Sequence, residues 1–313
     1  MIDKPLARSA VITCILNGSA GSNRAQRARE QIADLFARHG GQARVVLARN
    51  GSEIPDLARQ AMAEGSQPVV AGGGDGTLST VASALVGSRH ALGILPLGTL
   101  NHLARDLKIP LELEAAVANL FTGRLARIDV GEVNGRIFLN NSSLGLYPAI
   151  VREREARQRR GARKWIAFAL AVVTILWRYA PVQVWLRVES RPESGAPTPF
   201  VFIGNNRYEI EGARMGGRSR LDGGRLWICR APHAGLWTLL HLAVKALLGR
   251  VPHGGFDAVD GEQCEVRAKR GHLRVSADGE VISLETPLHY RIRPGALGVI
   301  VPIDVPSASS AGA

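Results

Sequence analysis

The chain has 313 residues and a formal net charge of +12, from 39 Lys and Arg against 27 Asp and Glu. Its length favours two domains, and its charge favours anionic partners such as nucleotides or acidic lipid headgroups. The 3 cysteines lack a CxxC pair and the 8 histidines lack zinc-binding spacing, which excludes a disulfide framework and a zinc site and favours a reducing cytosol.

The first third of the chain alternates between apolar runs and helical patterns. Runs typical of buried strands cover residues 10–17, 43–48, 67–73 and 91–98, and Ser52 is the expected start of the helix between the second and third runs. Strands that are apolar throughout and separated by helices indicate a parallel sheet covered on both faces. We therefore expect residues 1–127 to form a doubly wound α/β domain.

From residue 128 onward the pattern changes to many short strands. Asn134 and Gly135 predict a tight hairpin turn, because this pair readily adopts positive φ angles. The second domain, residues 128–299, is expected to be an antiparallel, sandwich-like β domain with helical segments near residues 148–179 and 235–248. Residues 300–313 are expected to return to the first domain.

A basic stretch precedes the longest apolar run. Residues 152–164 contain seven basic and two acidic side chains, and residues 165–177 are almost entirely apolar. This run is shorter than the roughly 20 residues that cross a bilayer. We expect a cytoplasmic protein that contacts the inner face of an anionic membrane, while a solvated helix face followed by a core helix stays an alternative.

The ends of three predicted strands carry glycine-rich turns. The segment VVAGGGDGTLST, residues 69–80, joins a strand to a helix, a place where backbone N–H groups and the helix dipole bind phosphate. A second cluster follows the next strand, with Gly98, Thr99 and Asn101, and a third follows the first strand after Leu16. The lysine of the GxxxxGK[ST] phosphate loop is missing. A tight connection without a ligand remains the alternative for each turn.

Three motifs together resemble a known family. GGGDGT, then PLGTLNHLAR, then a late DGE resemble the bacterial diacylglycerol kinase catalytic-domain family, which is similar to sphingosine and ceramide kinases. The resemblance spans nearly the whole chain. It implies a nucleotide-binding α/β domain and a β-rich domain for the lipid, with ATP and Mg²⁺ used to phosphorylate a lipid that has a free hydroxyl, such as diacylglycerol.

The resemblance also assigns site residues. It implies nucleotide contacts from Asn17, Gly73, Gly74, Asp75, Gly76, Thr77, Gly98, Thr99 and Asn101. The chain departs from the family at Gly18, where proline is usual. Asp222 resembles an acidic position that holds a structural Mg²⁺ in some bacterial members.

Two DGE triplets compete for the catalytic position. We assign it to Asp278 because the following segment resembles the family's ending, whereas Asp260 resembles an ordinary turn between strands. Asp278 is the expected general base, since phosphoryl transfer needs one group to receive the hydroxyl proton. Glu280 would orient Asp278 or meet Mg²⁺, and Asp75 would bind Mg²⁺ or hold its loop.

Two other functions stay open at this stage. One is a soluble nucleotide kinase similar to NAD kinases, which share the glycine loop but do not need PLGTLNHLAR. The other is a non-catalytic protein that binds anionic membranes. Nucleic acid ranks last among partners, because the basic residues lack interleaved aromatic side chains. The sequence does not fix the oligomeric state, and a homodimer stays open.

Overall fold

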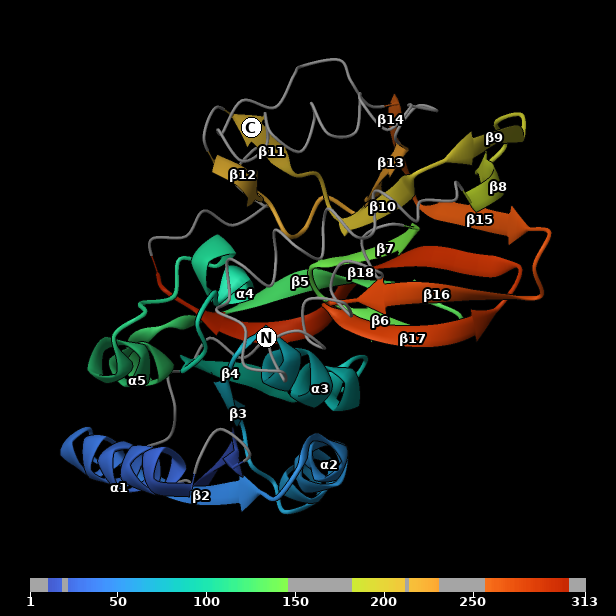
Figure 1. The fold of residues 1–313 in the computed structure, drawn as a ribbon. Helices are drawn as coiled ribbons and strands as arrows, with labels where there is room; N and C mark the ends of the chain where they lie inside the picture. Colours follow the sequence, from blue (N-terminus) through green and yellow to red (C-terminus); the bar gives the residue numbers. More distant parts are fainter. Residues whose placement is uncertain (1–10, 19–21, 146–181, 212–213, 231–256, 304–313) are drawn as a thin grey trace. The chain divides into compact units, whose positions relative to one another are not determined.

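The computed structural model describes residues 11–18, 22–145, 182–211, 214–230 and 257–303 (Figure 1). The chain divides into two compact units, one formed by residues 1–130 and 294–313 and the other by residues 131–293. Strands β5 (Arg124–Val133) and β18 (Leu288–Val301) each contribute residues to both units. The first unit is therefore built from two separate stretches of sequence.

A parallel sheet organises the described part of the first unit. Its strand order is β2-β1-β3-β4-β18, and every neighbouring pair is parallel. All residues of β4 and all but the last of β3 are buried, as expected for strands covered on both faces. The predicted α/β domain is confirmed. Strands β1 to β4 span Val11–Asn17, Gln42–Ala48, Val69–Gly73 and Ala91–Pro96.

Helices connect these strands (Figure 1). In the first of them, Ile32, Leu35 and Phe36 are buried in the core of the unit, at the spacing of an amphipathic helix. The helices α1 to α5 span Ser22–Arg38, Ile54–Ala63, Asp75–Leu85, His102–Asp106 and Leu113–Thr122.

One helix start differs from the expected one. A short 3-10 turn, η2 (Gly51–Glu53), precedes α2, and the side chain of Asn50 accepts hydrogen bonds from the backbone N–H groups of Ser52 and Glu53. The prediction that Ser52 opens this helix is wrong, because α2 begins at Ile54 with Glu53 as its N-cap and no side-chain cap. Asn50 caps the preceding 3-10 turn instead, since its amide oxygen reaches two N–H groups at once.

Two antiparallel sheets and the separate pair β11-β12 form most of the described part of the second unit. One has the order β14-β13-β10-β7-β16-β17, and the other contains β18, β15, β8 and β9. Their buried side chains form one cluster, and the hydroxyls of Ser142 and Tyr290 share a hydrogen bond of 3.1 Å. The predicted sandwich-like β domain is confirmed. Strands β6 to β17 span Arg136–Phe138, Asn141–Gly145, Val182–Val188, Ser194–Thr198, Phe200–Asn205, Glu209–Glu211, Arg214–Gly217, Leu226–Arg230, Asp257–Gly261, Gln263–Ala268, His272–Ala277 and Glu280–Glu285.

The predicted hairpin turn joins β5 to β6. Asn134 and Gly135 have φ angles of +44° and +81°, and the flanking residues Val133 and Arg136 are paired. Two successive positive φ angles are the signature of a two-residue hairpin turn. This prediction is confirmed.

Several expectations concern residues 146–181 and 231–256. The helical segments near 148–179 and 235–248 and the basic and apolar stretch at 152–177 all lie outside the described residues. In the part of the chain that is described, no helix is long and apolar enough to cross a bilayer. The three cysteines are free and buried, so none of them forms a disulfide.

Candidate active site

The glycine-rich loops lie at the carboxyl ends of three neighbouring strands. β1 ends at Asn17, β3 at Gly73 and β4 at Pro96, and β3 pairs with β1 on one side and with β4 on the other. Because these strands are parallel, the loops emerge at one edge of the sheet, where open α/β sheets bind ligands. Gly18 lies close to the last residue of β2, since an added Cβ would be 2.9 Å from the carbonyl oxygen of Ala48.

The loops after β3 and β4 touch through their glycines. A Cβ added at Gly98 would lie 2.4 Å from the Cα of Gly74, and one added at Gly73 would lie 2.6 Å from Oγ1 of Thr77. The backbone N–H of Leu97 also donates to the carbonyl oxygen of Gly73 at 3.1 Å. Non-bonded carbon atoms prefer separations of roughly 3.5–4 Å, so a side chain at Gly98 would force the loops apart.

Asp75 fastens one loop to the other. Its carboxylate accepts hydrogen bonds from the backbone N–H groups of His102 at 3.2 Å and Leu103 at 3.1 Å, in the first turn of α4. Asn101, with φ of +52°, closes its own turn by accepting from the Gly98 N–H and donating to the Gly98 carbonyl oxygen, both at 3.0 Å. Of the two roles predicted for Asp75, the structure shows the one that holds the loop. Its contact with Mg²⁺ stays a prediction.

Helix α3 begins immediately after the glycines. Its N-cap is Gly74, which has an extended backbone and no side chain to accept the first N–H groups of the helix. Thr77 is buried one turn into the helix, while Gly76 and Thr99 are exposed. A helix start without a side-chain cap combines N–H donors with the positive end of the helix dipole, which suits a phosphate group. The individual nucleotide contacts stay predictions.

Asp278 occupies a two-residue hairpin turn between β16 and β17. Ala277 pairs with Glu280, and Asp278 and Gly279 have φ angles of +47° and +87°. The Asp278 carboxylate accepts hydrogen bonds from three consecutive backbone N–H groups, those of residues 139, 140 and 141, at 2.7, 2.8 and 3.2 Å. These donors suit the acceptor-only character of an ionised carboxylate and fix its direction. Glu280 is exposed at the first position of β17.

The competing triplet has different surroundings. Asp260 belongs to β14 and lies opposite Trp227 of β13. Its carboxylate is 3.6 Å from a guanidinium nitrogen of Arg207, and both side chains are partly exposed. An exposed ion pair of this kind contributes little to stability, which makes Asp260 a suitable control position.

The sequence did not predict the partner of Asp278. Leu139, Asn140 and Asn141 lie about 140 residues earlier in the chain, at the link between β6 and β7. The signal that could have found them is the polar pair Asn140-Asn141 between two strand-like runs. Arg218, which also contacts this link, was not predicted either.

No residue group in the described part of the chain is arranged as a metal site. Among the described residues, no group of three or more His, Cys, Asp or Glu side chains lies close enough together to hold an ion. Asp222 forms an ion pair with Arg220 at 3.1 Å. That Asp222 holds a structural Mg²⁺ stays a prediction.

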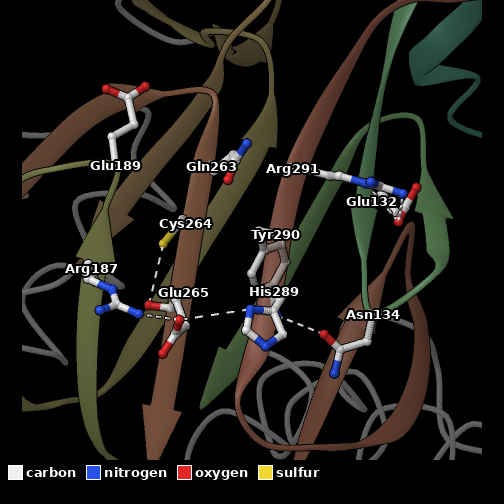
Figure 2. A pocket seen from close by; sticks show the side chains of 10 residues that line it. All are labelled: Glu132, Asn134, Arg187, Glu189, Gln263, Cys264, Glu265, His289, Tyr290 and Arg291. Carbon is white, nitrogen blue, oxygen red and sulfur yellow. Dashed lines mark hydrogen bonds and ion pairs between the residues drawn. The ribbon is translucent and has the colours of Figure 1, made fainter.

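An open pocket of about 490 Å³ lies in the second unit (Figure 2). Two ion pairs lie within its wall: Arg187 donates to Glu265 at 2.6 Å, and Arg291 lies 2.7 Å from Glu132. The hydrogen bond from Arg187 holds the pKa of Glu265 below its usual value. Burial raises the pKa of the Cys264 thiol to about 12, so this thiol stays protonated. None of the predicted site residues lines the pocket, which is formed by Glu132, Asn134, Arg187, Glu189, Gln263, Cys264, Glu265, His289, Tyr290 and Arg291.

Comparison with known proteins defines the class of this chain, which is a kinase with an α/β unit and an antiparallel β unit. The family model of the diacylglycerol kinase catalytic domain matches residues 11–133. The model described as the YegS C-terminal NAD kinase beta sandwich-like domain matches residues 144–301. A solved diacylglycerol kinase from Bacillus anthracis shares the fold, with a TM-score of 0.69, 18% identity and coverage of 94% of this chain and 98% of that one.

Curated relatives narrow this class to one family. A protein of Pseudomonas aeruginosa named "probable lipid kinase YegS-like" is 36% identical over 267 residues, which cover 80% of this chain and 82% of the relative. A protein of the same name from Pseudomonas savastanoi is 31% identical over 307 residues, or 95% of each chain. The chain belongs to the YegS-like family of lipid kinases with a diacylglycerol kinase catalytic domain.

Proposed function

We propose that this lipid kinase transfers the γ-phosphoryl group of MgATP to the free hydroxyl of a diacylglycerol-like lipid, with Asp278 as the general base. The observation that carries the ATP part is the contact between Gly74 and Gly98, which joins two strand-end loops at the N-terminus of α3. The lipid part rests on the names of the relatives.

The first unit would bind the phosphates. The N–H groups at the start of α3 carry the positive end of the helix dipole, and Gly73, Gly74 and Gly76 let an anion approach the backbone. Asp75 would keep the α4 start beside this loop through its two hydrogen bonds. Magnesium would arrive with ATP, with Asp75 as the residue expected to hold it, and would neutralise charge on the phosphates.

The second unit would supply the base. The lipid oxygen attacks the γ-phosphorus, the bond from that phosphorus to the bridging oxygen breaks, ADP leaves, and the hydroxyl proton passes to the Asp278 carboxylate. Three backbone N–H groups donate to this carboxylate and fix its direction, so the base would need little reorganisation during proton transfer. Glu280 is exposed two residues away and would orient the base or meet the magnesium of MgATP.

Two buried serine hydroxyls near Asp278 support the binding of a substrate that has polar oxygen atoms. Ser143 of β7 pairs with Ser276 of β16, two residues before Asp278, and both serines are 1% exposed. Neither hydroxyl has a hydrogen-bond partner among the residues that the structure describes. Buried polar groups normally have partners. The glycerol or ester oxygens of a lipid would provide them.

Transfer of label from γ-labelled MgATP to an extracted lipid mixture tests the function. We expect the label in an organic-soluble product, which mass spectrometry identifies as the phosphate ester of a lipid alcohol. A parallel reaction with NAD as acceptor examines the soluble-kinase alternative. Label in NADP and none in lipid would reject the proposed substrate class.

Membrane contact is part of the same proposal. Residues 152–164, which lie outside the described residues, carry the basic charge expected to meet an anionic leaflet, at about 1 kcal/mol for each basic side chain. Flotation with phosphatidylglycerol-containing liposomes at low salt tests it. Failure to float would remove the membrane role of this segment.

A further inference from the structure

Arg218 is buried at the link between β6 and β7. Only 4% of its surface is exposed. Its Nη1 donates to the carbonyl oxygens of Leu139 at 2.7 Å and Asn205 at 3.0 Å, and its Nη2 donates to Oδ1 of Asn140 at 2.8 Å. Its guanidinium carbon lies 5.3 Å from the centre of the Tyr208 ring. Burial of a charged side chain is costly unless its donors are satisfied, so these acceptors fix the guanidinium in one orientation.

One peptide group connects Arg218 to Asp278. Its carbonyl oxygen belongs to Leu139 and accepts from Arg218, while its N–H belongs to Asn140 and donates to Oδ1 of Asp278 at 2.8 Å. The amide of Asn205 donates to the same carbonyl oxygen at 2.8 Å. Hydrogen bonds in series polarise one another, so a cation at the carbonyl end strengthens the N–H at the other end as a donor.

The hairpin turn fixes the backbone of Asp278 but not the direction of its carboxylate. The backbone N–H of Asp278 donates to the carbonyl oxygen of Asn141 at 2.9 Å, which holds the turn against β7. The direction of the carboxylate depends on the N–H groups of residues 139 to 141, and therefore on what holds those peptides. Arg218 holds the central one.

We propose that Arg218 is a positioning residue for phosphoryl transfer, acting through the Leu139–Asn140 peptide to fix the carboxylate of Asp278. This inference rests on the proposed function, in which Asp278 receives the hydroxyl proton. Lysine is not an adequate substitute, because a planar guanidinium spans several fixed acceptors whereas an ammonium group is a single point of charge.

A double-mutant cycle tests the proposal. The wild type, Arg218→Lys, Asp278→Asn and the double variant are compared by kcat for label transfer and by KM for ATP, per folded enzyme. We expect Arg218→Lys to lower kcat by roughly 100-fold, as a misplaced catalytic group does, with the KM for ATP unchanged. In the Asp278→Asn background the same change is expected to have no further effect. Arg225→Lys, an exposed arginine paired with Glu189, is the matched control.

The outcomes separate the two claims. Near-normal turnover in Asp278→Asn rejects the proposed base and, with it, the role of Arg218. A loss in Asp278→Asn, together with an equal fold-loss from Arg218→Lys in both backgrounds, rejects the inference alone, and so does wild-type kcat in Arg218→Lys. If Arg218→Lys does not fold, Asn140→Ala removes one acceptor of the guanidinium and leaves the peptide in place. We then expect a several-fold loss of kcat that disappears in the Asp278→Asn background, and an unchanged kcat overturns the proposal.

Discussion

Replacing Gly98 by alanine would place a methyl group between the two glycine loops. The new Cβ would lie 2.4 Å from the Cα of Gly74 and 2.7 Å from Oδ1 of Asn101. Carbon atoms in contact are roughly 3.5–4 Å apart, so the loops would have to separate by about 1 Å. Overpacking of this kind costs about 1–3 kcal/mol of stability. A displacement of about 1 Å at a reacting group costs roughly 100-fold in rate, so the larger effect is expected on activity.

Urea unfolding and steady-state kinetics with varied ATP measure both effects. We expect Gly98→Ala to lower the free energy of unfolding by about 1–3 kcal/mol, to raise the KM for ATP and to lower kcat by roughly 100-fold. Gly51→Ala is the matched control in the same unit, because an added Cβ there meets nothing within 4 Å. Wild-type stability together with a wild-type KM in Gly98→Ala would refute the argument that close loop contact forms the phosphate site.

The further predictions concern stability and thiol reactivity. Asp75→Ala removes the hydrogen bonds that cap α4 and should cost about 1–2 kcal/mol in thermal unfolding, and an unchanged melting temperature would show that this cap is unimportant. Desolvation on burial raises the pKa of Cys229 and Cys264 from 9.0 to about 12, so native thiols should not react with Ellman's reagent at pH 8, and rapid reaction would contradict their burial. For the same reason stability should fall as pH rises from 9.0 towards 12, because the unfolded thiols release protons that the folded ones keep, and serine at both positions should reduce that slope. Gly135→Ala forces a side chain into φ of +81° and should cost about 1–2 kcal/mol, and an equal melting temperature would argue against this turn geometry.

Much of the first unit could be predicted because local sequence dictates it. Strands such as β4, buried along their whole length, must be apolar at every position, and the chain shows such runs directly. The Asn134-Gly135 turn was predictable for a similar reason, since few residue pairs adopt two positive φ angles. For both the strand and the turn, the residues that determine the structure lie within the element itself.

The contacts that hold the site together could not be predicted in this way. Asp75 was assigned to the glycine loop, but its carboxylate caps a helix that begins 27 residues later. Arginine is usually found at the surface, so the sequence gives no reason to expect Arg218 to be buried. Its burial depends on carbonyl groups supplied by residues 139 and 205. Neither contact has a local pattern, because each partner is brought into place by strand pairing rather than by neighbouring sequence.

The glycines illustrate an intermediate case. Their clustering at strand ends predicted a phosphate loop, and the structure gives Gly98 a second reason to be glycine, its approach to Gly74. Sequence alone cannot separate a glycine that faces a ligand from one that faces another backbone, since both require the absence of a side chain. Where two loops pack together beside a bound phosphate, a glycine can meet both requirements, close contact with the ligand and close contact with the other backbone.

The central claim is that Asp278, rather than Asp260, receives the hydroxyl proton. Asparagine at position 278 places an amide group against backbone N–H donors and should cost about 1–3 kcal/mol, so turnover must be expressed per folded molecule. Asp260→Asn alters only an exposed ion pair with Arg207.

The most direct measurement is therefore kcat for phosphoryl transfer from MgATP to diacylglycerol in these two variants. We predict that Asp278→Asn loses roughly 100- to 10,000-fold in kcat while its KM for ATP is kept, and that Asp260→Asn retains wild-type turnover. Wild-type kcat in folded Asp278→Asn, or a comparable loss in Asp260→Asn, would contradict the account.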